Sequence, residues 1–230
     1  MERLAESFSI ALRLILTADP TVAEITFRTL AISAGATLAG VLLFMPLACL
    51  LHFSSFPGKG VLLCFIQALY GVPTVSIGLI VFLVFSRTGP LGSLSLLFTP
   101  QAIAAAELLL IAPVLIGQVV ASLKGVPPDA LDTIRSLGAG RLMSALVILR
   151  EARFSVLSAV FLAFGRAISE VGAAMMVGGN IAGRTRTLTT AISLEVGRGE
   201  TSLSIALGII LLALALIVST AVHWTGQRKP

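Results

Sequence analysis

Five apolar segments, each long enough to cross a lipid bilayer as a helix, constrain this chain more than any other feature. The hydrocarbon core of a bilayer requires about 20 mainly apolar residues for each helical crossing. The segments that meet this requirement are residues 27–51, 60–85, 101–123, 154–177 and 201–222. Only 12% of the residues are charged, whereas a soluble domain has about 25%. We therefore expect an all-α integral membrane protein with one transmembrane domain at residues 21–230.

The N-terminal stretch differs from these spans because charged residues interrupt its apolar ones. Glu2, Arg3, Glu6 and Arg13 leave no uncharged stretch long enough for the apolar region of a secretory signal peptide. We expect residues 1–20 to form a separate helix that lies along the membrane interface, with a frayed tail as the alternative.

Basic residues predict the orientation of membrane spans, because cytoplasmic loops close to the spans carry most of them. In this chain they are divided almost evenly between the two sides of the membrane. Arg3 and Arg13, however, lie far from any span, so they weigh little. We therefore place residues 124–153 and the C-terminus inside the cell, and the N-terminus outside.

Each of the first three spans contains one proline inside it: Pro46, Pro73 and Pro113. Proline removes a helical hydrogen bond and can kink or break the helix. In a membrane, neighbouring helices can satisfy the freed carbonyl groups. Two interpretations stay open, namely kinks in a bundle that opens and closes, or the ordinary frequency of proline in membrane helices.

A polar segment bounded by glycine and proline, residues 125–153, separates the third span from the fourth. Its two prolines end the preceding helix, and Asp129 can cap a new helix that begins at Ala130. Apolar residues lie near one face of this new helix and charged residues near the other. The pattern predicts a short amphipathic helix at 129–141, outside the bilayer and suited to contact another protein, and then a second helix at 141–153.

The sequence Asp-Thr-Ile-Arg-Ser-Leu-Gly at 132–138 resembles the cytoplasmic signature of permease subunits of ABC importers. That signature reads Glu-Ala-Ala, three residues, then Gly; here Thr133 and Ile134 replace the alanines, and Arg150-Glu151 replaces a later Leu-Pro. The resemblance implies a coupling helix that docks on an ATPase subunit, with an ordinary helix on the membrane surface as the alternative. The residues expected to couple to the ATPase are Asp129, Ala130, Asp132, Arg135, Ser136, Leu137, Gly138, Ala139 and Arg141.

A second motif covers residues 164–192, in the fourth span and the loop after it. It contains Ile-Ser-Glu-Val-Gly-Ala-Ala-Met-Met-Val-Gly-Gly-Asn-Ile, and it ends within the sequence Leu-Thr-Thr-Ala-Ile-Ser-Leu-Glu at 188–195. These sequences resemble permeases of the molybdate/tungstate group, and their form is most similar to tungstate-type permeases. The wider resemblance covers most of residues 25–225, whereas the tungstate type rests mainly on 129–200.

This resemblance implies the type I ABC importer permease fold, with five transmembrane helices, an N-terminal interfacial helix and a cytoplasmic coupling helix. It also implies the partners: a second copy of the chain, an ABC ATPase subunit dimer, an extracytoplasmic oxyanion-binding protein and the bilayer of the cell inner membrane. The implied function is passage of tungstate across that membrane, with molybdate or sulfate as the alternative. We expect no cofactor, no metal site and no nucleic-acid partner.

The residues expected on the gate or translocation path are Arg166, Glu170, Gly172, Met175, Met176, Gly179 and Asn180. Arg166 and Glu170 share one helix face, and an unpaired charge in hydrocarbon is costly. They either face a cytoplasmic vestibule near the coupling helix or form a pair that fixes helix packing. The glycines allow close approach of backbones, and the methionines form either an apolar gate or ordinary packing. Glu107, a buried acid in the third span, could bond a neighbouring helix.

Residues 178–200 form a polar loop rich in glycine and threonine, expected on the outer side. Arg184, Thr185 and Arg186 bring positive charge and a hydroxyl group to it. Such a surface attracts an oxyanion directly or, as the preferred interpretation, an acidic surface of the binding protein. A solvated loop without a role remains the third possibility.

Nothing in the sequence resembles a nucleotide-binding P-loop or a nucleophile elbow, so we do not expect the chain to hydrolyse ATP itself. Cys49 and Cys64 lie in apolar segments and are interpreted as small core residues. An ion-coupled secondary transporter or a membrane-embedded assembly factor is the alternative from another class. Secondary transporters typically have internal repeats, and the sequence displays none.

Overall fold

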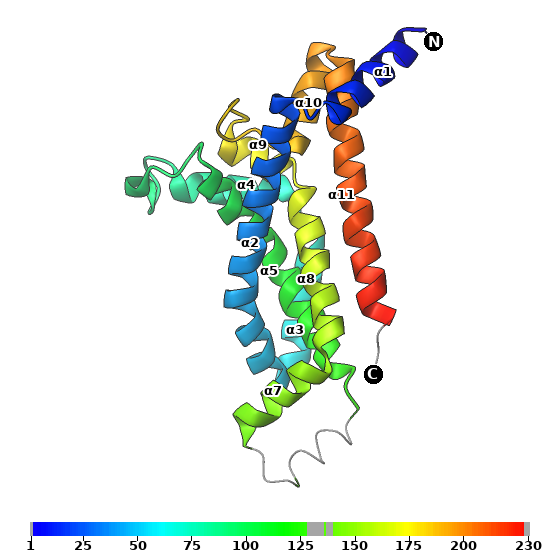
Figure 1. The fold of residues 1–230 in the computed structure, drawn as a ribbon. Coiled ribbons are helices and arrows are strands. Elements are labelled where there is room, and N and C mark those ends of the chain that lie inside the picture. The colour runs from blue at the N-terminus through cyan, green and yellow to red at the C-terminus, as the bar shows by residue number, and fades with distance from the viewer. Residues whose placement is uncertain (1, 128–135, 137–139, 228–230) are drawn as a thin grey trace.

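The computed structural model describes residues 2–127, 136 and 140–227, and all regular structure within these ranges is helical. Long helices run side by side through the molecule, and shorter helices gather at its two ends (Figure 1). Three helices are long and apolar enough to cross a membrane, and the number rises to five if each of two bent helix pairs is one span. The predicted all-α, multi-span architecture is confirmed.

The first two helices, α1 (Glu2–Leu16) and α2 (Pro20–Phe53), meet at a sharp turn. Asp19 caps α2, since its Oδ1 accepts hydrogen bonds of 2.9 and 3.2 Å from the N–H groups of Thr21 and Val22. With 34 residues, α2 is about 50 Å long and exceeds the hydrocarbon core of about 30 Å. α2 begins at Pro20, before the predicted start of the first span at residue 27. The N-terminal segment forms the helix α1, as expected.

The second predicted span is not one continuous helix. It consists of α3 (Lys59–Ala68), the 3-10 turn η1 (Leu69–Gly71) and α4 (Thr74–Phe85). The two parts are bent by 96°, because Pro73 forces the preceding residue out of the helical region: Val72 has φ −63° and ψ 131°. The prediction of one helix over 60–85 is therefore wrong in its geometry.

The third span is α5 (Pro100–Lys124), preceded by a loop that contains the short 3-10 helix η2 (Gly92–Leu94). Pro113 lies inside α5, as Pro46 lies inside α2, and neither helix ends there. Of the three prolines, Pro73 alone separates two helices.

The fourth predicted span is also broken. It is entered through α7 (Arg141–Glu151) and consists of α8 (Arg153–Ile168) and α9 (Gly172–Gly178), which are bent by 59°. The break falls at residues 169–171, where Ser169 has φ −87° and ψ 2°. One straight helix over 154–177 was expected, so this prediction is corrected too.

The predicted polar loop at 178–200 contains a helix, α10 (Leu188–Arg198). Thr187 and Thr190 form a capping box at its start: each accepts a hydrogen bond from the backbone N–H of the other. Gly199, with φ 79°, ends it in the left-handed conformation. The last span is α11 (Thr201–Gln227).

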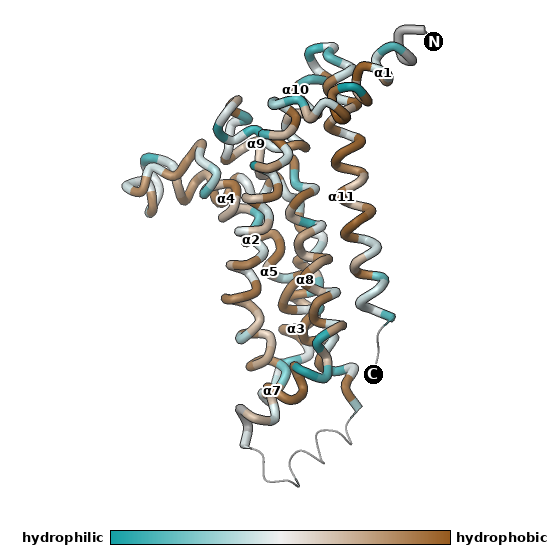
Figure 2. The backbone as a smooth tube through the Cα atoms, in the orientation of Figure 1, coloured by the Kyte–Doolittle hydropathy of each residue, from teal (hydrophilic) through white to brown (hydrophobic). Residues whose placement is uncertain are grey.

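The centre of the bundle lies where α5 packs against α2 and α8, with α11 against the other side of α8. Gly40 of α2 makes room for Leu115 of α5, since an added methyl group there would lie 2.8 Å from its Cδ1. Apolar colour follows the long helices, and hydrophilic colour concentrates near their ends (Figure 2). α1 and α10 lie at one end of the bundle, and α7 and the last turns of α11 lie at the other.

Candidate functional site

Glu170 lies at the break between α8 and α9 with only 1% of its side chain exposed. Its Oε1 accepts a 2.8 Å hydrogen bond from the N–H of Ala173, which satisfies one of the free donors at the start of α9. Its Oε2 lies 3.5 Å from Nη1 of Arg166 in α8. Its backbone carbonyl accepts a 2.6 Å hydrogen bond from Oγ1 of Thr189 in α10. Glu170 thus joins three helices at one point.

The Arg166–Glu170 pair lies at the end of α8, whereas α7 leads into the start of that helix. α8 has 16 residues and is therefore about 24 Å long. The bond from Thr189 places Glu170 beside α10. The expected position in a cytoplasmic vestibule near the coupling helix is therefore wrong, and the ion pair agrees with the other interpretation, a pair that fixes packing.

α9 packs closely against α4, one half of the other bent pair. A methyl group added at Gly78 would lie 2.8 Å from Cα of Ala173, which leaves no room for a side chain there. A methyl group added at Gly172 would lie 3.0 Å from side-chain atoms of Thr74 and Val75, which would have to shift slightly. The fourth span approaches a neighbouring backbone closely, as predicted, but this contact lies between Ala173 and Gly78 of α4.

Two methionines on α9, Met175 and Met176, are partly buried. Met176 contributes to the contact with α4, because a methyl group added at Gly78 would lie 3.4 Å from its Cβ. The gate assigned to these methionines from the sequence stays a prediction.

The end of α9 is shaped by Gly179 and Asn180, whose φ angles of 69° and 50° are both left-handed. Nδ2 of Asn180 donates a 3.1 Å hydrogen bond to the carbonyl of Thr190 in α10. Gly178 packs against Ile103 of α5, from which an added methyl group would be separated by only 2.7 Å. These residues therefore hold α9 against α5 and α10, and their place on a translocation path stays a prediction.

The outer loop, which we define as residues 179–187, contains the three predicted contact residues. Their side chains differ in how far they are buried. Arg184 is exposed. Thr185 is fully buried, and its hydroxyl donates a 2.6 Å hydrogen bond to the carbonyl of Gly178 and accepts one of 2.9 Å from the N–H of Ile181. The prediction that Thr185 contacts an external partner is corrected, because its side chain closes the loop from inside.

Arg186 belongs to a network of charges between the outer loop, α2 and α10. Its Nη1 lies 3.5 Å from Oε1 of Glu195, and the two side chains are 16% and 6% exposed. Arg198 reaches the same carboxylate oxygen at 3.3 Å. Arg28 of α2 donates a 3.2 Å hydrogen bond to the carbonyl of Arg186 and pairs with Glu24. Arg186 is therefore largely engaged within the chain, whereas Arg184 stays available on the surface.

Glu107 of α5 is buried, with 3% of the residue exposed. Its Oε1 accepts a 3.2 Å hydrogen bond from the hydroxyl of Ser33 in α2. The expected bond to a neighbouring helix is confirmed, and its partner could not be read from the sequence. Thr29 similarly joins α2 to α10, since its hydroxyl accepts a 2.8 Å hydrogen bond from the N–H of Leu188.

Most of the predicted coupling helix lies outside the described residues: Asp129, Ala130, Asp132, Arg135, Leu137, Gly138 and Ala139. Of the others, Ser136 is exposed, and Arg141 begins α7. α7 runs to Glu151 without the interruption that a Leu-Pro ending would cause, and α8 begins two residues later, at Arg153.

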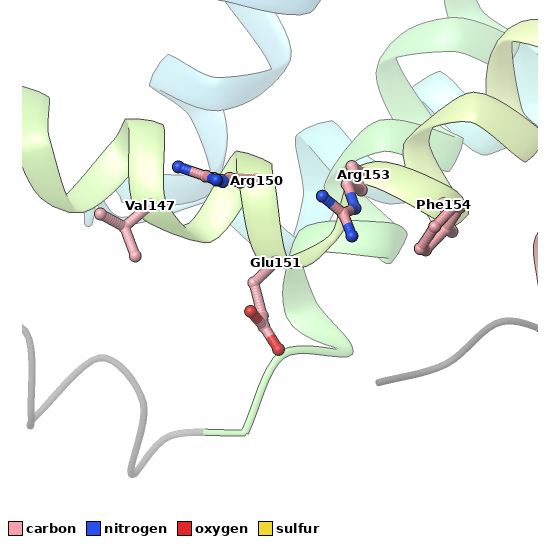
Figure 3. Close-up of a pocket in the computed structure, with 5 residues that line it drawn as sticks. All are labelled: Val147, Arg150, Glu151, Arg153 and Phe154. Carbon is pink, nitrogen blue, oxygen red and sulfur yellow. The ribbon is translucent and has the colours of Figure 1, made fainter.

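A recess of about 300 Å³ lies at the junction of α7 and α8 (Figure 3). Its lining residues are Val147, Arg150, Glu151, Arg153 and Phe154. The guanidinium carbon of Arg153 lies 4.8 Å from the ring centre of Phe154, a cation–π contact. The residues that replace the Leu-Pro ending of the resembling family thus form part of a charged surface at the same end of the bundle as α7.

The described helices thus form a bundle of apolar spans, two of which are broken, and the class of protein follows from its relatives. The chain belongs to the family described as binding-protein-dependent transport system inner membrane components, which matches residues 36–229. It is therefore a membrane-embedded permease subunit. The predicted membership of the ABC importer permeases is confirmed.

Known relatives cover nearly the whole chain. A probable anion ABC transporter permease protein of Haloferax volcanii is 41% identical over 90% of this chain and 91% of its own length. A tungstate uptake system permease protein of Peptoclostridium acidaminophilum is 36% identical over 97% of this chain and 98% of its own length. A crystal structure of an amino acid ABC transporter has the same fold, with a TM-score of 0.67 and 20% identity, over 93% of this chain and 96% of that one.

Proposed function

We propose that this chain forms the membrane path of an ABC importer for tungstate. The observation that carries the proposal is the similarity to a tungstate uptake permease along almost the entire chain, at 36% identity. This similarity includes the region of Glu170, α9 and the outer loop, where the structure departs from a simple bundle. The path would be lined by the second, third and fourth spans. Because α4 of the second span packs closely against α9 of the fourth, a small rotation of this pair would change the width of the path between the two copies.

Two copies of the chain would enclose the path, because five helices offer too little wall for a gated pore. An ABC ATPase dimer would dock at residues 129–141, of which Ser136 is exposed. ATP hydrolysis would take place in that partner. An extracytoplasmic binding protein would deliver the anion at the outer loop, where Arg184 presents a positive charge. α1 would lie along the membrane interface as a separate N-terminal element.

Uptake by cells tests the proposal. A strain that lacks its own tungstate uptake is complemented with this chain together with its ATPase and binding protein, and cell-associated tungsten, molybdenum and sulfur are measured after exposure to each oxyanion. Tungstate accumulation that depends on this chain is the expected result. Accumulation of molybdate or sulfate without tungstate would replace the substrate, and no accumulation of any of the three would contradict the proposal.

The proposed docking of the ATPase is tested with Asp132→Lys and Gly138→Val. Both changes should abolish co-purification of the ATPase subunit with the permease while the permease still inserts in the membrane. Gly35→Val is the control, because a methyl group there would meet no atom within 4 Å. Unchanged co-purification in both variants would place the docking surface elsewhere.

A further inference from the structure

α10 and the outer loop form one bonded unit at the end of the molecule opposite α7. The capping box of Thr187 and Thr190 fixes the start of α10. The side chain of Asn180 bonds the carbonyl of Thr190 across this unit. The ion pair between Arg186 and Glu195 fastens the loop to the body of α10. A force applied to the loop from outside would therefore move α10 with it.

α9 and α4 form a second unit, packed so closely that a methyl group added at either of two glycines would displace its neighbours. Gly78 meets Ala173, and Gly172 meets Val75, at distances of 2.8 and 3.0 Å from an added methyl carbon. The helical hydrogen bonds are interrupted at residues 169–171, where the path of the chain bends by 59°. α9 can therefore change its angle to α8 at the break, and α4 would move with it.

The two units meet at both ends of α9: the outer loop continues from its last residue, where Thr185 bonds the carbonyl of Gly178, and Glu170 is bonded to both units at its start. Its carboxylate holds the first turn of α9 through the N–H of Ala173. Its carbonyl receives the hydroxyl of Thr189, on the first turn of α10. Capping alone does not require this arrangement, because a neutral serine or threonine caps a helix without the cost of burying a carboxylate. The pairing with Arg166, whose side chain is 34% exposed, offsets that cost.

We propose that Glu170 is a positioning residue for transport: through Thr189 it links the outer loop to α9 and α4, so that docking at the outer loop sets the angle of these two short helices. This inference rests on the proposed function, because it needs a partner that docks outside and a path that changes width inside. It adds a connection at the start of α9 to the one that the chain makes at its end.

Thr189→Val tests the link, because it removes the hydroxyl with little change in shape and leaves the cap of α9 intact. The matched control is Thr37→Val, a buried threonine whose hydroxyl bonds only the carbonyl of Ser33 in its own helix. In the full transporter in liposomes, tungstate-loaded binding protein is added and the ratio of stimulated to basal ATPase rate is measured. We expect Thr189→Val to lower this ratio by about five-fold, the scale of one buried hydrogen bond, and Thr37→Val to leave it unchanged.

Two further variants separate positioning from simple stabilisation. Glu170→Gln keeps an acceptor for Ala173, so it should retain the ratio within about two-fold, whereas Glu170→Ala should lower it by about ten-fold. Each ratio is measured on assembled transporter with its melting temperature recorded. A lower melting temperature with an unchanged ratio in Glu170→Ala and Thr189→Val would overturn the inference.

A measurement that needs no substrate keeps the link testable apart from the proposed function. Met176→Cys, with Cys49→Ala and Cys64→Ala, places a single thiol on α9. Adding Thr189→Val should raise its labelling rate by a maleimide several-fold, and adding Thr37→Val should not. An unchanged rate would overturn the link, whereas a wild-type transporter that tungstate-loaded binding protein fails to stimulate would overturn only the proposed substrate.

Discussion

At the residue scale, burial divides the arginines of the outer loop into two roles. Arg184 is exposed, whereas Arg186 is held against Glu195 with 16% of its side chain exposed. Breaking a largely buried ion pair costs about 3 kcal/mol or more, because it leaves an unpaired charge. An exposed charge contributes little to stability and mainly affects the rate of encounter with a charged partner.

We therefore expect reversal of the two charges to affect different properties, binding of the partner in one case and stability in the other. Arg184→Glu should weaken binding of the external binding protein and leave the melting temperature of the permease unchanged. Arg186→Glu should lower the free energy of unfolding by about 3 kcal/mol, since two carboxylates would then face each other. Calorimetry of the purified permease and titration with the binding protein check both effects, and equal melting temperatures would contradict the assignment.

The glycine at the contact of α4 and α9 allows a second prediction at this scale. Gly78→Val should destabilise the protein by about 1–3 kcal/mol, because overpacking forces the backbones apart. Gly35→Val, in a long helix with nothing within 4 Å of an added methyl group, is the control for β-branching in a helix. Thermal unfolding in detergent measures both, and an equal loss in the two variants would show that the contact yields without strain.

At the scale of elements, α10 shows how a short helix depends on its ends. Its capping box satisfies backbone groups that the first turn leaves free, and Gly199 ends it. Thr187→Ala should lower the local stability of α10 by about 1 kcal/mol, seen as faster amide hydrogen exchange at residues 188–192. Thr220→Ala, which loses a bond within α11 only, is the control. Unchanged exchange in the Thr187 variant would mean that tertiary contacts alone hold the helix.

The two bent spans belong to the same scale. The sequence explains the first break, because Pro73 restricts the backbone conformation of the residue before it. The second break has no proline, and it depends on Glu170 capping α9 and on the fit of Gly172 against α4. The cap is local, three residues along the chain, but the fit of Gly172 against α4 joins residues about a hundred positions apart, so spacing along one helix could not reveal it.

At the scale of the whole molecule, α1, α10 and the outer loop share one end, and α7 and the last turns of α11 share the other. Arg184→Cys and Ser136→Cys, each with Cys49→Ala and Cys64→Ala, report these ends because both positions are exposed. In right-side-out vesicles, a membrane-impermeant maleimide should label only the Arg184 variant, and only the Ser136 variant in inverted vesicles. The reverse pattern would invert the orientation inferred from the basic residues.

Membrane insertion can be predicted from the amino-acid sequence alone, because the length of an apolar segment and its lack of charge suffice for that conclusion. Its motifs also predicted the family. The place of Glu170 beside α10, the burial of Thr185 and the packing of α9 on α4 emerge only once the chain is folded. The length of an apolar segment shows only whether it can cross a bilayer. Contacts between helices depend on side-chain shape and on hydrogen bonds between residues far apart in the chain.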